Sequence, residues 1–337
     1  MPALSTIHPT LLDVTKRLDP NGKIDAIAEI LTQELPVMED MVVVEGNLPT
    51  GHKTTVRTGI PIPTWRKLYG GVQPTKSTTA QVTDTCGMLE AYAEVDKALA
   101  DLNGNTAAFR LSEDRAHIEG MAQELGSTLF YGNEGSEPEA FTGLAPRYNS
   151  LSAENGQNIV NAGGSGSDNT SIWLIGWSDQ TCHGIYPKGS KAGLQMEDKG
   201  QVTIENVDGN GGRMEGYRSH YRQDMGLVLR DWRYVARVCN IDVSALTTDG
   251  TAADRAAAQK ALITYMIMAS ERIPNFGKGR FCWYVNRTIR EALRLGIQEK
   301  IANNLTWETV EGKRVMTFDD IPVKRVDSLV NTEAAVS

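Results

Sequence analysis

The chain has 337 residues, of which 40% are hydrophobic and 23% charged, and its formal net charge is −8. The length is enough for two compact regions, the proportions are ordinary for a folded protein, and the negative charge argues against coating nucleic acid as a main activity. No apolar run approaches the 18 or so residues of a membrane-spanning helix, and the first residues show no secretory-signal pattern.

Residues 1–40 are predicted to form an N-terminal arm. Its clearest feature is a helical stripe that ends before Pro36, because apolar residues recur there at steps of three and four. The members of the stripe are Ile24, Ile27, Ala28, Leu31 and Leu35. The spacing does not decide whether the stripe packs on its own domain or on another subunit.

Residues 41–84 change character, because short β-like segments at 42–45, 53–58 and 64–69 are separated by proline and glycine. This pattern predicts a hairpin that projects from a body. Trp65, Leu68 and Tyr69 are its predicted contact residues, since aromatic side chains are enriched where protein surfaces meet.

The same segment is depleted of acidic residues. Residues 47–83 contain no Asp or Glu. They do contain five basic residues, Lys53, Arg57, Arg66, Lys67 and Lys76. A basic segment on an acidic body suits docking onto a neighbouring copy, but a solvated basic loop has the same composition, and charge alone does not separate the two.

Residues 106–131 are predicted to form a long amphipathic spine helix with one buried stripe. The stripe consists of Leu111, Ile118, Met121, Ala122, Leu125 and Leu129. About 25 residues at 1.5 Å each give a rod of roughly 37 Å, long for a globular domain.

The middle of the chain is predicted to be rich in β-structure. Residues 171–178 form a strand, 193–200 a turn, and 217–238 a long hairpin that carries interleaved arginines and aromatic residues. The arginines are Arg218, Arg222, Arg230, Arg233 and Arg237. Such interleaving also occurs where proteins stack on RNA, but Asp224 and Asp231 lie within it, which favours arginines that meet carboxylates of a neighbouring copy.

From residue 243 the pattern becomes α/β. A helix is expected over 251–271 and a buried strand over 280–285. Asn286 is the expected cap of a second helix running to about residue 300, and strands at 315–318 and 321–325 close the region.

No enzyme motif is present. The sequence lacks GxSxG, HExxH and Walker A patterns, so no catalytic residue, cofactor or metal site is predicted. Cys182 and His183, with His220 and Cys239, match no compact zinc spacing, and Glu134, Glu137 and Glu139 are expected to form a solvated loop. The four cysteines, with Cys86 and Cys282 completing the set, are widely spaced and are expected to be reduced thiols.

Several long motifs carry a family resemblance. They are AFRLSEDRAHIEGMAQELGSTLFYGN (108–133), FTGLAPRYNSLS (141–152), GGSGSDNTSIWLIGW (163–177), HGIYPKGSKAGLQ (183–195) and GLVLRDWRYVARVCNID (226–242). Together they resemble the major capsid proteins of tailed bacteriophages, specifically the epsilon-15-like group. The resemblance implies an α+β fold of the Hong Kong 97 type, with a permuted order of elements as one expectation.

The resemblance also implies a domain plan. It comprises an N-terminal arm (1–40), an extended E-loop hairpin (41–84), a peripheral domain with the spine helix (85–242) and an axial domain (243–337). The inter-subunit contacts expected on this plan are Lys53, Arg57, Trp65, Arg66, Lys67, Tyr69, Arg218, Arg222, Arg230, Arg233 and Arg237.

The implied function is that of a coat protein, assembled in the bacterial cytoplasm as pentamers and hexamers and closed into an icosahedral virion shell around double-stranded DNA. A scaffold, a portal and a cementing or decoration protein are the further partners implied, with no membrane. Two alternatives stand beside this expectation: an accessory virion protein, and a cytosolic hydrolase that uses Cys182 and His183.

Overall fold

The computed structural model describes residues 9, 33, 35–104, 106–205, 211–247, 252–298, 305–310 and 313–337. Two compact units are present: a smaller one with Met88–Gly126 and Lys191–Asp224, and a larger one with Glu34–Gly87, Ser127–Ser190 and Met225–Ser337. The helix predicted in the N-terminal arm lies outside the described residues. Within them, no helix has the length and apolarity needed to cross a membrane.

The larger unit is built on a mixed sheet whose central strand is β5 (Asn169–Trp177). β5 lies antiparallel to β9 (Val235–Asp242) and β10 (Arg280–Val285), and one residue pair joins it in parallel to β6 (Cys182–Tyr186). The outer strands are β1 (Val43–Glu45), β4 (Ile159–Asn161), β11 (Leu305–Val310), β12 (Lys313–Phe318) and β13 (Ile321–Arg325). All nine residues of β5 are buried, so both faces of this strand are covered.

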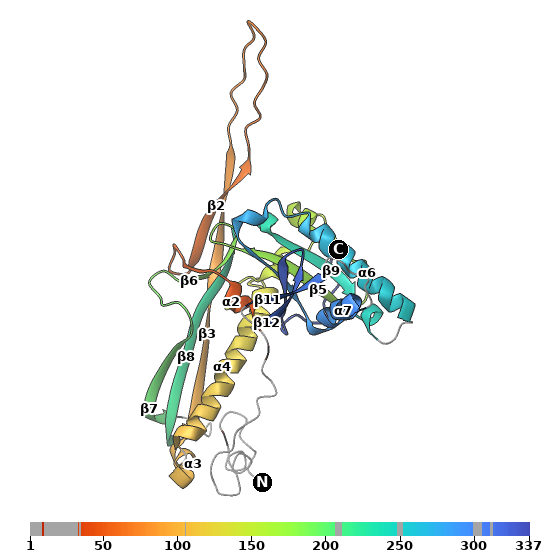
Figure 1. Cartoon of the computed structure of the whole chain (residues 1–337). Helices are drawn as coiled ribbons and strands as arrows, with labels where there is room; N and C mark the ends of the chain where they lie inside the picture. Colours follow the sequence, from red (N-terminus) through yellow and green to blue (C-terminus); the bar gives the residue numbers. More distant parts are fainter. Residues whose placement is uncertain are drawn as a thin grey trace. The chain divides into compact units, whose positions relative to one another are not determined.

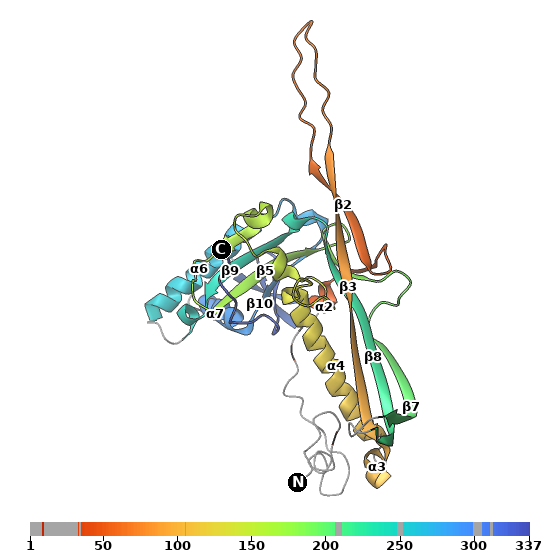
Figure 2. The same ribbon diagram turned by 180° about the vertical axis from the view of Figure 1, so that it is seen from behind.

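Alternate side chains of β5 enter two different layers. Ile172 and Leu174 join a core that includes α6 (Ala252–Ser270) and α7 (Arg287–Gln298). Trp173 points the other way and packs on the rings of Phe130 and Tyr148. In Figure 2, α6 and α7 lie together beside β9 and β5.

The predicted elements of the C-terminal region are confirmed. α6 and β10 occupy the expected ranges, and β12 and β13 form the closing pair. Asn286 caps α7 as expected, because its Oδ1 accepts a hydrogen bond from the Ile289 backbone N–H at 2.8 Å. Two short helices, α2 (Val37–Asp40) and α5 (Leu144–Arg147), complete the larger unit.

The predicted hairpin is also confirmed. β2 (Gly51–Gly59) pairs antiparallel with the first half of β3 (Thr78–Asp96), in a register from Gly51 opposite Thr85 to Gly59 opposite Thr78. Residues 60–77 connect the two strands, and Figure 1 shows this end standing clear of the rest of the larger unit. The strand predicted at 64–69 was wrong: these residues form an irregular loop with a turn at Leu68 and Tyr69.

In its described part, the smaller unit packs one long helix on a sheet. β8 (Arg213–Leu229) lies between β7 (Gln195–Glu205) and β3, so the turn predicted at 193–200 was wrong for most of its length. The spine helix is present as α4 (Thr106–Tyr131), preceded by the short α3 (Lys97–Ala100). Phe109 clusters with Val95, and Met121 with Ala93 and Tyr221, which joins this part of α4 to the sheet.

Two details of the predicted elements need correction. Leu111 and Ile118 are not part of the buried stripe of α4, since they are 52% and 38% exposed. Residues 217–238 are not a hairpin either: β8 pairs with β6 and β7, while β9 pairs with β4 and β5. A 3₁₀ turn, Trp232–Tyr234, separates the two strands. Asp231 caps this turn, because its side chain accepts a hydrogen bond from the Arg233 N–H.

Candidate assembly surface

The tip of the hairpin displays apolar side chains to water. Trp65 and Tyr69 are fully exposed, and Ile60, Ile62 and Leu68 nearly so. The turn is well formed, because the Gly70 N–H donates to the Lys67 carbonyl oxygen at 3.0 Å and Tyr69 adopts a φ of 63°. Contiguous exposed apolar side chains on a soluble chain mark an interaction surface.

The hairpin stem carries the exposed cations Lys53 and Arg57. Lys53 is held at its backbone, where Asn47 donates to the Lys53 carbonyl oxygen at 2.8 Å and accepts from the Lys53 N–H at 2.7 Å. Arg66 and Lys67 are exposed on the tip beside Trp65. The acid-free segment therefore presents cations and apolar groups together.

The root of the hairpin, by contrast, is buried and tightly fixed. Asp84, the first acidic residue after the acid-free segment, is buried and pairs with Arg147 at 2.8 Å. Arg147 also donates to the carbonyl oxygens of Thr142 and Leu227 at 3.1 and 3.0 Å. A Cβ on Gly226 would lie 2.5 Å from the Thr85 carbonyl oxygen, so only glycine permits this approach. The root thus anchors the hairpin rigidly to the larger unit.

Two imidazoles lie near the root. The rings of His52 on β2 and His183 on β6 meet edge to face at 5.9 Å between centroids. Burial lowers the pKa of His183 to about 4, and repulsion from His52 and Arg230 acts in the same direction. Burial likewise lowers the pKa of His52. Both rings are therefore neutral at pH 7.

A groove runs between the hairpin stem and the turn after β8. It has a volume of about 470 Å³ and contains three of the predicted contact residues, Arg57, Arg230 and Arg233. Its other lining residues include Val56, Ile60, Glu154, Asp231 and Trp232. Arg233 is held by Asp231 at 2.8 Å, whereas Arg230 donates to the Asp179 carbonyl oxygen at 3.2 Å.

Two other predicted arginines, on β8, have carboxylates in the same chain. Arg218 pairs with Glu94 at 2.6 Å, and Arg222 pairs with Asp224 at 2.9 Å and Glu90 at 3.6 Å. Both lie on one face of the small sheet, where Tyr92 stacks on His220. These pairs fix the sheet of the smaller unit and leave the two guanidinium groups less available to a neighbour.

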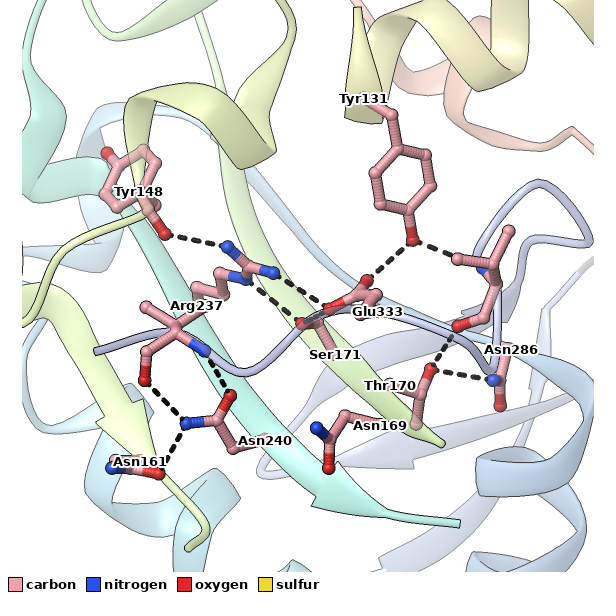
Figure 3. Close-up of polar contacts among 12 residues, drawn as sticks. Tyr131, Tyr148, Asn161, Asn169, Thr170, Ser171, Arg237, Asn240, Asn286 and Glu333 are labelled. Carbon is pink, nitrogen blue, oxygen red and sulfur yellow. Dashed lines mark hydrogen bonds and ion pairs between the residues drawn. The ribbon is translucent and has the colours of Figure 1, made fainter. Parts of the chain in front are cut away.

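Arg237 is the clearest departure from the predicted contact set. It is 3% exposed and pairs with Glu333 at 2.8 Å, while it donates to Ser171 Oγ at 3.0 Å and to the Tyr148 carbonyl oxygen at 2.7 Å. Figure 3 shows the guanidinium enclosed by these groups, with Tyr131 donating to the other Glu333 oxygen at 2.6 Å. Arg237 therefore fastens the segment around Glu333 inside its own chain, where its guanidinium is not accessible to a neighbouring copy.

The structure thus sorts the predicted residues into separate groups. The exposed hairpin carries Lys53, Arg57, Trp65, Arg66, Lys67 and Tyr69, and the groove joins Arg57 to Arg230 and Arg233. Arg218, Arg222 and Arg237 lie elsewhere with internal partners. The sequence analysis missed the Asp84–Arg147 ion pair at the root. The signal for it was that Asp84 is the first acidic residue after the acid-free segment.

The residues weighed for catalysis are poorly suited to it. Burial raises the pKa of Cys182 to about 12, which disfavours the thiolate that a nucleophile requires. Cys182 and His183 are successive residues of one strand, so their side chains point to opposite faces. Glu134, Glu137 and Glu139 lie in an exposed loop, and the described residues hold no cluster of three or more metal-ligating side chains.

Comparison with known proteins adds independent information. Residues 19–337 match the family described as Major capsid protein GP7. The chain is 40% identical to a chain in the near-atomic structure of bacteriophage Epsilon15, with a TM-score of 0.77 over 100% of this chain and 99% of that chain. No curated protein sequence matches.

Two further solved structures match at lower identity. The decorated capsid of bacteriophage JBD30 matches at 12% identity and a TM-score of 0.44, over 90% of this chain and 92% of that one. Microbacterium phage Oxtober96 matches at 10% identity and a TM-score of 0.43, over 68% and 98%. The Epsilon15 match, with its full coverage in both directions, is the informative one.

Proposed function

The chain belongs to the major capsid protein GP7 family, with the Hong Kong 97-type fold, and is the coat protein of an icosahedral phage shell; from that premise we propose that its hairpin, residues 51–85, binds a neighbouring copy. The tip and stem supply the contacts, namely Lys53, Arg57, Trp65, Arg66, Lys67 and Tyr69, with Arg230 beside the stem. Repetition of this contact holds pentamers and hexamers together.

One observation carries the proposal: the apolar tip is fully exposed while the root is buried and ion-paired. A fixed root limits the positions that the tip can take, which lowers the conformational entropy lost on docking. Burying a tryptophan ring removes roughly 200 Å² from water, about 5 kcal/mol before the costs of association. Trp65 is therefore the expected hot spot.

The wider plan of the molecule follows the same premise. We assign residues 1–40 to an arm, 41–84 to the E-loop segment that carries the hairpin, 85–242 to a peripheral domain and 243–337 to an axial domain. A scaffold, a portal and a decoration protein are the further partners proposed, and the shell encloses double-stranded DNA without reading its sequence. The role is structural, and no catalytic step is assigned to the chain.

The test replaces the apolar tip. The variant Trp65→Ser/Leu68→Ser is expected to fold normally, since neither side chain is buried in the chain, but to reduce the yield of closed shells at least about tenfold. Met268→Ser, an exposed apolar residue of α6, is the matched control and is expected to assemble like the parent. Circular dichroism checks the fold, and sedimentation with electron microscopy counts shells. Parental shell yield from the tip variant would refute the role of the tip.

A further inference from the structure

We propose that the groove lined by Arg57 and Arg230 receives an acidic loop, residues 133–139, from a second copy of the chain. This inference rests on the proposed function, because it names the surface that meets the hairpin stem. The occupant is identified by its carboxylates, which match the guanidinium groups of the groove.

The groove offers two cations that make no ion pair with the residues that the structure describes. Among the described residues, no carboxylate lies within ion-pair distance of Arg57 or Arg230, and the one hydrogen bond described for the Arg230 side chain goes to a backbone carbonyl. Arg233, by comparison, is already neutralised by Asp231 through two hydrogen bonds of 2.9 and 2.8 Å. Ile60 and Val56 give the groove an apolar wall between the charged groups.

The loop at 133–139 has the complementary character. All seven of its residues are exposed, and three of them are glutamates. Turn hydrogen bonds hold the loop in shape, with Ser136 and Glu137 donating to the Asn133 carbonyl oxygen at 3.0 and 2.9 Å and Ala140 donating to Glu137 at 3.0 Å. Glu134 accepts from the Thr85 hydroxyl at 3.0 Å, whereas Glu137 and Glu139 have no cationic partner within the described ranges.

The two surfaces are distinct on each copy, because no loop residue lines the groove. A contact between different surfaces is heterologous, and heterologous contacts between identical chains generate rings when the rotation closes. This is the type of contact that a capsomer requires. The Arg–Glu pairing also fixes orientation as well as affinity, since guanidinium and carboxylate match in a planar, two-pronged geometry.

Packaged nucleic acid is the competing occupant, since phosphates also bind arginine. Glu154 and Asp231 line the same groove and repel any anion, but a phosphate backbone brings a negative charge with every nucleotide, whereas the loop brings only a few. A short loop can instead aim two carboxylates at Arg57 and Arg230. The observations therefore favour the protein loop.

Charge reversal on both sides provides the test. Two double variants are each expected to lower shell yield about tenfold through like-charge repulsion: Arg57→Glu/Arg230→Glu and Glu137→Lys/Glu139→Lys. The quadruple variant, which combines them, is expected to recover most of the lost yield. Lys191→Glu/Lys199→Glu, exposed on the smaller unit, is the charge-matched control for the arginine variant and should leave yield unchanged. Melting curves of all variants check folding.

A cryo-electron microscopy map of parental shells completes the test. The expected result places Glu137 or Glu139 of one copy within 4 Å of Arg57 or Arg230 of the next. Two outcomes overturn this inference alone. One is a quadruple variant that does not recover its shell yield. The other is a map in which the hairpin lies on a neighbouring copy but another segment fills the groove. A hairpin folded on its own chain overturns the proposed function as well. Arg57→Glu/Arg230→Glu shells that form normally but lose DNA would assign the groove to phosphate and also overturn the inference.

Discussion

His183 shows how a single buried side chain makes the stability of the molecule depend on pH. Its pKa is about 4 in the folded chain, below the usual 6.5, because burial and the nearby His52 and Arg230 disfavour the imidazolium, with Asp179 acting in the opposite direction. The unfolded chain therefore binds more protons between pH 6.5 and 4. Lowering the pH through that window favours unfolding.

We expect the parental protein to lose about 2 kcal/mol of unfolding free energy between pH 7 and pH 4.5 through His183, as measured by denaturant titration of capsomers. His183→Gln cannot take up the proton and should show a flatter dependence. Equal slopes for the two proteins would mean that another group is responsible.

At the scale of an element, the hairpin depends on one ion pair at its root. Arg147→Met leaves the Asp84 carboxylate buried without its cation and removes two hydrogen bonds to backbone carbonyls. The expected cost is about 3 kcal/mol of unfolding free energy, with faster amide exchange in β2 and the adjoining part of β3 than in β5. Hydrogen exchange with mass spectrometry measures both effects.

The control for that change is Arg213→Met, which breaks an exposed pair with Glu205 and should cost less than about 1 kcal/mol. Asp84→Leu/Arg147→Met removes both charges and is expected to recover part of the loss. A loss no larger than that of Arg213→Met would show that the root pair does not anchor the hairpin.

Elements were predictable from the sequence where the signal is local. The periodicity of α4 and α6 and the cap at Asn286 depend on neighbouring residues, and the structure has all three. Pairing between distant strands left no local trace, so the partners of β8 and β9 were missed. For the same reason Arg237 looked available, since its partner Glu333 lies 96 residues away.

Burial was the weakest inference, because an apolar stripe does not reveal what covers it. Leu111 and Ile118 fit the spacing of the helix core, yet both are substantially exposed in the chain. The hairpin was predicted correctly because the lack of acidic residues over 47–83 is a property of composition, which does not depend on distant contacts. Of the candidate contact residues, those on the hairpin are exposed, whereas Arg218, Arg222 and Arg237 have partners inside the chain.

For the whole molecule, charge is divided between a basic hairpin and an acidic remainder, and the complete chain has a net charge of −8. The attraction between hairpin and neighbour should weaken as salt rises from about 0.1 M to about 1 M, because the Debye length falls from roughly 10 Å to 3 Å. We expect the association rate, followed by light scattering, to fall over this range.

Arg57→Gln/Arg66→Gln/Lys67→Gln removes three hairpin charges and should assemble more slowly at low salt with a weaker salt dependence. If the triple variant and the parent respond to salt equally, the hairpin charges do not steer association.

The bare aromatic tip has a consequence for the life of a newly made subunit. Folding leaves Trp65 and Tyr69 in water, so a solitary chain is complete as a fold yet retains a strong tendency to adhere to other surfaces. On the proposed role of the tip, each subunit is able to associate as soon as it folds, and overproduced coat protein that finds no partner copy should aggregate.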